Sequence, residues 1–165
     1  MILYLIRHGV AMDRTDPSCP AEPERPLTRE GIKKTRAAML GLRAMEAQPE
    51  AMISSPYVRA AQTAEIACET LGFPRDKVHH SEALKPGGDP AVLFKELARV
   101  RAKETMCFGH APQLDQVIAY ALGTRAVVTE LKKAGVACLE VESFTPPKAR
   151  LLWMFPPKAL RKLGD

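Results

Sequence analysis

The chain has 165 residues, of which 46% are hydrophobic and 26% are charged, and its formal net charge is +5. These proportions are typical of one folded domain and exclude a disordered chain, while no apolar run approaches the roughly 18 residues that a membrane span needs. Basic residues are spread along the chain and only 5% of the residues are aromatic, so a nucleic-acid surface is not indicated. We therefore expect one domain over residues 1–165 that favours anionic ligands and binds neither nucleic acid nor a membrane.

Cysteine usage and the N-terminus bear on the compartment in which the protein works. The cysteines lie far apart and none forms a C-x-x-C pair: Cys19, Cys68, Cys107 and Cys138. Residues 1–4 lack the basic region of a signal peptide. A reducing cytoplasm is the simplest setting for such a chain.

The first elements predicted along the chain are a strand, a long loop, a helix and a second strand. Residues 2–6 form an apolar run typical of a buried strand, and residues 9–27 form a polar loop rich in proline and acidic residues. Thr28 is placed to cap a helix that continues to about residue 47, and residues 51–54 form a short strand. The inner side of this helix is expected to carry Ile32, Met39, Leu42 and Met45.

A second helix is predicted to begin at Ser55, with this serine as the N-terminal cap and Pro56 at the first helical position. Gly72 and Pro74 mark its end. Apolar residues recur every three or four positions along it, which indicates a buried face composed of Val58, Ala61, Ala64, Cys68 and Leu71.

The rest of the chain continues the alternation of strands and helices. The predicted strands are 78–82, 105–109, 136–142 and 149–155. Asp89-Pro90 and Pro112 open two further helices, and the second of them ends at Gly123. The last residues, 157–165, form a short basic tail that is expected to be a solvated helix face.

This alternation predicts an α/β fold with a mainly parallel sheet that is covered on both faces. Three predicted strands are followed by polar, reactive residues: Arg7-His8, Ser54-Ser55 and Gly109-His110. Arg59 lies in the first turn of the helix after the second of these pairs. Because ligands of such sheets bind outside the carboxyl ends of the strands, we expect these groups to meet at one edge.

Two arginines and two histidines at one sheet edge suit a phosphoryl group. Arginine presents a fixed fork of N–H donors that matches phosphate oxygens and keeps its charge at neutral pH, and a histidine can attack phosphorus or stabilise charge. Phosphoryl transfer asks mainly for positioning and charge neutralisation, so we expect neither a metal nor a cofactor. The alternative is a metal site at His79-His80. Because adjacent strand residues point to opposite faces of a sheet, at most one of these two histidines could join His8 and His110.

These residues lie in motifs that resemble the histidine phosphatase (phosphoglycerate mutase-like) superfamily. Residues 6–9 (IRHG) resemble the R-H-G signature of this superfamily, and residues 55–63 (SPYVRAAQT) resemble its S-P-x-x-R-A-x-Q-T segment. Gly109-His110 is similar to its second histidine motif. Within the superfamily the chain is most similar to the small SixA-type phosphohistidine phosphatases, through residues 25–28 (RPLT), residues 84–89 (LKPGGD) and residues 110–112 (HAP). The resemblance implies a phosphoglycerate mutase-like fold, a three-layer αβα sandwich that forms a single histidine phosphatase domain.

The resemblance also implies a role for each matching position. His8 would be the nucleophile that is transiently phosphorylated, and Arg7, Arg59 and His110 would hold the phosphoryl oxygens. Arg25 would reach the pocket from the long loop and bind substrate, with a plain surface arginine as the alternative.

Three carboxylates are candidates for the general acid that would protonate the leaving group. Glu82 is favoured, as a substrate-binding residue and candidate general acid, because it follows a predicted strand. Asp13 lies in the long loop, and Asp89 is also placed to cap a helix.

The chain departs from the mutase-type members, which carry an Asn soon after R-H-G and a long insertion with a catalytic Glu. Here no Asn is present and little sequence is available for a lid. We therefore expect an open site and a metal-independent phosphatase that acts on protein phosphohistidine, with a phosphotransfer domain of a signalling relay as partner. The alternatives are a phosphomonoesterase that acts on small molecules or on phosphoserine or phosphothreonine, and an inactive phospho-residue binding module.

Overall fold

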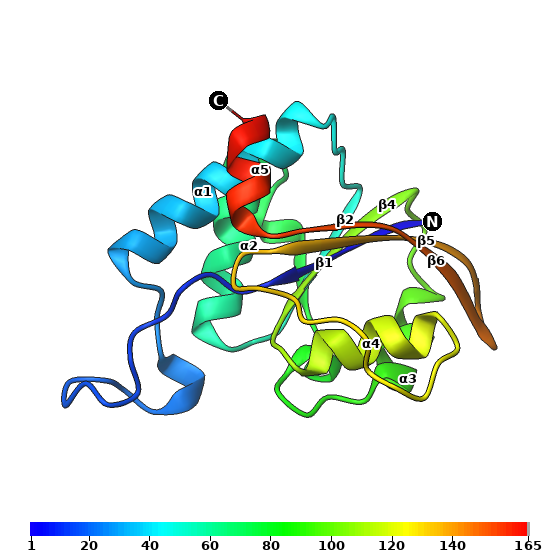
Figure 1. Ribbon diagram of the computed structural model, residues 1–165, viewed down its shortest axis with the longest axis horizontal. Coiled ribbons are helices and arrows are strands. Elements are labelled where there is room, and N and C mark those ends of the chain that lie inside the picture. Colours follow the sequence, from blue (N-terminus) through cyan, green and yellow to red (C-terminus); the bar gives the residue numbers. More distant parts are fainter. Residues whose placement is uncertain (165) are drawn as a thin grey trace.

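The computed structural model describes residues 1–164, which form six strands, five α-helices and three short 3₁₀-helices (Figure 1). The strands are β1 (Ile2–Arg7), β2 (Ala51–Ser54), β3 (Val78–His80), β4 (Glu104–Gly109), β5 (Val136–Phe144) and β6 (Pro147–Phe155). The α-helices are α1 (Arg29–Ala44), α2 (Val58–Leu71), α3 (Pro90–Leu97), α4 (Gln113–Ala121) and α5 (Pro157–Leu163). The 3₁₀-helices are η1 (Glu22–Glu24), η2 (Arg75–Lys77) and η3 (Glu82–Leu84). Strands and helices alternate from β1 to β5, as the sequence predicts.

All six strands belong to one sheet, in the order β3-β2-β4-β1-β5-β6. The four strands from β3 to β1 are parallel, whereas β5 runs antiparallel to β1 and β6 antiparallel to β5. In the registers, Arg7 is opposite Gly109, and Ser54 is opposite Phe108. The carboxyl ends of β1, β2 and β4 therefore lie side by side, and the residues that follow them share one edge of the sheet.

Helices cover both faces of the sheet, which confirms the predicted three-layer αβα sandwich. Figure 1 shows α1 and α5 on one side and α3 and α4 on the other. Because strand side chains alternate between faces, Tyr4 and Ile6 pack with α1, α2 and α5, while Leu3 and Leu5 pack with α3 and α4. None of the helices within residues 1–164 is long and apolar enough to cross a membrane.

The start of α2 differs from the prediction. The helix begins at Val58 with Tyr57 as its N-cap, not at Pro56 with Ser55 as cap. The backbone N–H of Ser55 instead donates to the carbonyl of Phe108 at 2.9 Å, which extends the contact between β2 and β4. The buried face of α2 is also rotated, since it includes Arg59 and the hydroxyl of Thr63 in addition to small apolar residues.

The start of α1 is as predicted, but of its expected inner residues Ile32 is exposed and Met45, the C-cap, is only partly buried. Thr28 caps the helix by accepting the N–H of Gly31 at 2.9 Å. A Cβ on Gly31 would lie 2.0 Å from the carbonyl oxygen of Val10, so the long loop lies directly against this glycine. Because Gly31 faces inward, the next residue, Ile32, turns outward and is 37% exposed.

Residues 157–163 of the predicted basic tail form α5, which packs against α1, and residue 165 lies outside the described residues. Leu160 is fully buried, and a Cβ on Gly41 of α1 would lie 2.0 Å from its carbonyl oxygen. The lysines and arginine of α5 keep to the outer side, so the predicted solvated face is present but the helix also contributes to the core.

Candidate active site

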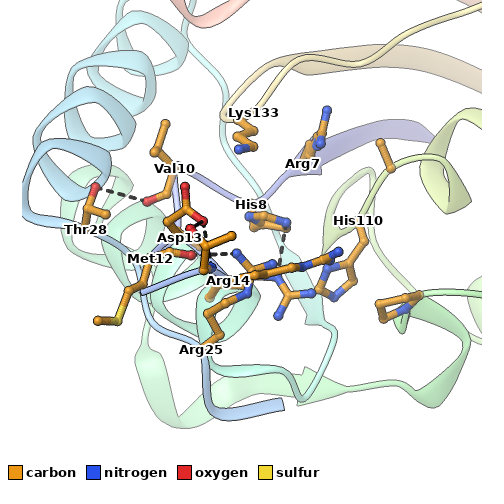
Figure 2. A pocket seen from close by; sticks show the side chains of 15 residues that line it. Arg7, His8, Val10, Met12, Asp13, Arg14, Arg25, Thr28, His110 and Lys133 are labelled. Atoms are coloured by element: carbon orange, nitrogen blue, oxygen red, sulfur yellow. Dashed lines mark hydrogen bonds between the residues drawn. The ribbon is translucent and has the colours of Figure 1, made fainter. Parts of the chain in front are cut away.

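The ends of β1 and β4 bring the two histidines together. The N–H of His8 donates to the carbonyl of Gly109 at 3.0 Å, and the rings of His8 and His110 lie 5.1 Å apart between centroids. Arg7 and Arg59 join them in the wall of a cleft with a volume of about 710 Å³ (Figure 2). The structure thus brings together the four residues that the sequence places at the sheet edge.

His8 is held as a neutral imidazole with a defined tautomer. Its Nδ1 lies 2.7 Å from the carbonyl oxygen of Gly9, and because a carbonyl can only accept, Nδ1 carries the hydrogen and Nε2 carries the lone pair. Burial lowers the pKa of His8 to about 3, and His110 and the nearby arginines act in the same direction, against the opposing hydrogen bond to Gly9. At neutral pH, His8 therefore presents an unprotonated nitrogen.

A glycine is needed immediately after His8, because a side chain at position 9 would collide with α1. A Cβ at this position would lie 2.2 Å from Thr35 Oγ1 of α1. The N–H of Gly9 donates to Thr63 Oγ1 of α2 at 3.1 Å, which fixes the loop immediately after His8.

Arg59 lies in the first turn of α2 and is 2% exposed. Its Nε donates to Nε2 of His8 at 3.2 Å, and its Nη1 donates to the carbonyl of Glu22 at 2.7 Å. Burial lowers the pKa of Arg59, although a guanidinium remains charged at neutral pH. The arginine thus lies directly beside the nitrogen that has the lone pair.

His110 is oriented by a serine of the neighbouring strand end. Its Nε2 lies 2.9 Å from Ser55 Oγ, which also accepts the N–H of Tyr57 at 3.3 Å. Within residues 1–164 the serine hydroxyl hydrogen has no other acceptor, so it is assigned to His110 Nε2 and the ring hydrogen to Nδ1. Burial, followed by the charge of Arg59, lowers the pKa of His110 to about 3, and the ring is neutral at pH 7.

His110 Nδ1 has no hydrogen-bond partner in the described part of the chain, although the residue is only 2% exposed. A buried N–H without a partner is costly. In a cleft lined by cations, a phosphoryl oxygen would supply the missing acceptor.

Arg7 is held by the loop between α4 and β5. Its Nη1 donates to the carbonyl of Leu131 at 2.8 Å, and the N–H of Leu131 donates to Asp115 of α4 at 2.9 Å. The N–H of Ala134 donates to the carbonyls of both Arg7 and His8, at 3.0 and 3.1 Å. This loop places Lys133 in the cleft wall. In the view of Figure 2, Lys133 and Arg25 lie on opposite sides of His8.

Arg25 also lines the cleft, as the sequence predicts for the long loop. It is 8% exposed, and its Nη1 donates to the carbonyl of Met12 at 2.8 Å. The 3₁₀-helix η1 immediately precedes it, so both Arg25 and Glu22 are placed by the same short segment.

The three candidate general acids occupy different positions. Glu82 begins η3, is exposed and pairs with Lys85, and it does not line the cleft. Asp89 caps α3 by accepting the N–H of Ala91 at 2.8 Å. Asp13 lines the cleft, where its carboxylate accepts both the N–H and the hydroxyl of Thr15. The structure therefore places only Asp13, of these three, in the cleft wall.

Several residues near the reactive groups were not identified from the sequence as site residues. They are Ser55, Glu22, Arg14 and Lys133. Ser55 stands in a recognised motif, yet its position before a proline favoured a capping role. Arg14 and Lys133 lie in loops and Glu22 lies in the short 3₁₀-helix η1, where no periodic pattern indicates which way a side chain points. Within residues 1–164 no group of three or more His, Cys, Asp or Glu side chains could hold a metal ion.

Comparison with protein families and curated proteins gives consistent matches. Residues 3–86 match the family described as the histidine phosphatase superfamily (branch 1). An uncharacterized protein of Picosynechococcus sp. is 34% identical over 140 residues, which cover 82% of each chain. Phosphohistidine phosphatase SixA of Escherichia coli is 27% identical over 123 residues, or 72% of this chain and 73% of the relative.

Solved structures share the fold over almost the whole chain. The protein histidine phosphatase SixA complexed with tungstate has a TM-score of 0.83 and 23% identity, and the match covers 97% of this chain and 99% of that one. A mycobacterial glucosyl-3-phosphoglycerate phosphatase has a TM-score of 0.71 and 18% identity, with coverage of 92% and 97%. The architecture is therefore the phosphoglycerate mutase-like fold that the sequence predicts.

Proposed function

Because the chain belongs to the histidine phosphatase superfamily (branch 1), we propose that it is a phosphatase that removes the phosphoryl group from protein phosphohistidine. The observation that carries this proposal is the state of His8, whose unprotonated Nε2 lies beside Arg59 in a cleft also lined by Arg7 and His110. A neutral imidazole nitrogen among cations suits attack on a phosphorus atom whose oxygens those cations neutralise.

The reaction takes place in two transfers. In the first, His8 Nε2 forms a bond to phosphorus while the bond from phosphorus to the substrate nitrogen breaks. A proton on the other ring nitrogen of the substrate lets its imidazole leave as a neutral ring, and His8, which keeps its Nδ1 hydrogen, becomes a phosphoimidazolium. In the second, water attacks the phosphohistidine on His8, and inorganic phosphate is released as the His8 nitrogen takes back its lone pair. Arg7, Arg59 and the Nδ1–H of His110 would stabilise the charge of the transferred group in both transfers. We expect the arginines to supply enough positive charge for activity without added metal.

The choice of a phosphohistidine substrate is supported by relatives and by the shape of the site. The relative in Escherichia coli is a phosphohistidine phosphatase, and the similarity covers most of both chains. A cleft of about 710 Å³ is much larger than one phosphoryl group, so it leaves room for a protein side chain and its backbone. The proposed partner is accordingly a phosphohistidine-containing protein such as a phosphotransfer domain, and the four free cysteines fit a reaction in the cytoplasm.

A phosphomonoesterase activity is the competing function on the same site. The fold is shared with a glucosyl-3-phosphoglycerate phosphatase and with a phosphoserine phosphatase of Entamoeba histolytica. Such an activity would use the same four residues, but it would need a proton donor for the alkoxide that leaves.

The test compares kcat/KM on a phosphohistidine protein with kcat/KM on a panel of phosphate monoesters, with His8→Ala as the inactive control. A preference of about a hundredfold for phosphohistidine, or ~2.7 kcal/mol of discrimination, supports the proposal. An equal or reversed preference supports the phosphomonoesterase instead. If neither substrate class releases phosphate, the chain is a binding module, and the proposed function is wrong.

A further inference from the structure

One carboxylate contacts three of the arginines that line the cleft. Glu22 Oε1 lies 2.6 Å from Nε of Arg14 and 3.2 Å from Nε of Arg25, and Glu22 Oε2 lies 3.2 Å from Nη2 of Arg59. The carbonyl of Glu22 also accepts Nη1 of Arg59 at 2.7 Å. A single residue of η1 thus holds Arg59 through both its backbone and its side chain.

Glu22 is not part of the cleft wall, although Arg14, Arg25 and Arg59 are. Its carboxylate therefore contacts these arginines from outside the space that a substrate would occupy. Each guanidinium has five N–H donors. Arg59 uses one donor in a hydrogen bond to His8 and one in a hydrogen bond to the Glu22 carbonyl, and its Nη2 also pairs with the Glu22 carboxylate. At least two of its donors therefore remain for a phosphoryl group.

The charge of Glu22 is stable at neutral pH. Burial alone would raise its pKa, but Arg25, Arg59 and Arg14 outweigh that effect and hold the pKa of Glu22 below its usual range. An ionised carboxylate cannot donate a proton, so Glu22 is not a general acid. Its side chain is 42% exposed, and exposed ion pairs stabilise a fold only slightly, so its main effect is on the direction in which the arginines point.

We infer that Glu22 is a positioning residue that orients Arg59 and Arg25 toward the transferred phosphoryl group. The inference rests on the proposed phosphatase activity but not on the identity of its substrate. Donors that are fixed before the reaction stabilise charge as it develops, whereas donors that must first reorient do so less well. Loss of Glu22 should therefore slow the chemical step. It should not weaken the binding of an anion in the ground state, because it also removes a negative charge near the cleft.

The test replaces Glu22 by Gln and uses Glu24→Gln as the matched control. Glu24 lies in the same 3₁₀-helix, is exposed, and makes no ion pair within residues 1–164, so its replacement removes the same charge without touching the arginines. The substrate is p-nitrophenyl phosphate, and inorganic phosphate serves as the competitive probe of anion binding. We expect kcat of Glu22→Gln to fall about tenfold to hundredfold, as for displaced catalytic groups. Its inhibition constant for phosphate should stay equal or decrease, and Glu24→Gln should match the wild type.

The size of the side chain provides a second test. Glu22→Asp keeps the charge but is one methylene shorter, so it cannot span all three arginines, and its kcat should lie between those of the wild type and Glu22→Gln. Equal losses in Glu22→Gln and Glu24→Gln, or weaker phosphate binding with unchanged kcat, would overturn the inference. A wild type that binds phosphate but releases none from p-nitrophenyl phosphate or phosphohistidine would refute the proposed function itself, and with it the activity that Glu22 is inferred to support.

Discussion

Arg59 Nε donates a hydrogen bond to His8 Nε2 across 3.2 Å. The cation that is proposed to hold the phosphoryl group therefore contacts the nitrogen that is proposed to attack it. This contact disfavours a proton on Nε2, because a second positive charge there would be repelled. In the proposed mechanism, a phosphoryl oxygen accepts the Nε hydrogen of Arg59 when substrate binds, and this exchange frees the lone pair of His8.

Replacement of Arg59 by Lys tests whether the fork of the guanidinium is needed. A lysine keeps the charge, but it cannot contact His8, the Glu22 backbone and a phosphoryl group at once. We expect kcat/KM to fall about a hundredfold or more, as when a charge-stabilising donor is removed. Steady-state kinetics measure the effect, and a Lys variant with full activity would contradict the role given to Arg59.

The stability of the protein should depend on pH through the two histidines. Their pKa values are lowered to about 3 in the folded protein, whereas histidine in an unfolded chain titrates near 6.5. Between these values the unfolded chain binds more protons, so the free energy of unfolding should decrease as the pH falls from about 6.5 toward 3. Urea denaturation at several pH values measures this slope. A variant with His8→Gln and His110→Gln should show a shallower slope than the wild type, and identical slopes would argue against neutral buried histidines.

Ser55→Ala should remove the preference of His110 for the tautomer with its hydrogen on Nδ1. Without the serine hydroxyl, Nε2 loses its hydrogen bond, and the ring hydrogen can lie on either nitrogen. We expect kcat to fall about tenfold, less than the ~100-fold loss when a charge-stabilising donor is removed outright, because part of the His110 population keeps its hydrogen on Nδ1. The imidazole ¹⁵N chemical shifts should move from an Nδ1–H pattern toward a mixture of tautomers.

Ser54→Ala is the matched control for this prediction. Ser54 is equally buried, but its hydroxyl donates to the carbonyl of Ser55 and does not contact His110. Unchanged ¹⁵N shifts in Ser55→Ala would rule out the proposed assignment, as would an equal change in the control.

Gly9→Ala should destabilise the fold and distort the site, because the new Cβ would meet Thr35 Oγ1 at 2.2 Å. We expect a loss of about 1–3 kcal/mol in the free energy of unfolding, as for other overpacked sites. Thr35→Ala should restore much of this loss in the double variant, since it removes the clashing atom. On its own, Thr35→Ala should lower the free energy of unfolding by less than the removal of a typical buried hydroxyl does, since Thr35 Oγ1 has no hydrogen-bond partner in the described residues. Thermal unfolding of the wild type, the two single variants and the double variant measures the coupling energy between positions 9 and 35. Additive losses of stability would exclude the clash as the cause of the Gly9→Ala effect.

The sequence predicts the positions of Arg7, His8, Arg59 and His110 well because each lies at the end or start of a regular element. Apolar runs locate the strands, and parallel pairing then brings their carboxyl ends to one edge. The same reasoning did not find Glu22, because its partners lie in two separate segments and no local pattern connects them. Contacts of this kind depend on the conformation of a whole loop.

The errors within the helices have a similar origin. The predicted face of α2 was chosen from apolar residues alone, whereas the actual face includes the buried Arg59, which lines the cleft. Ile32 was expected inside because it is apolar, but the close contact of Gly31 with Val10 sets the rotation of α1. In both helices a contact with the long loop or the site decided the orientation.

The pairing of β1 with β4 determines when the protein can first become active as it is synthesised. The proposed nucleophile, His8, is made among the first residues, yet His110 follows β4, and the chain between them must be complete before the two rings can meet. A nascent chain that ends before β4 therefore carries His8 and Arg59 but lacks His110. Catalytic competence should thus appear late and all at once, when β4 enters between β1 and β2. The appearance of activity can then report on the insertion of β4 in a refolding experiment, without an added probe.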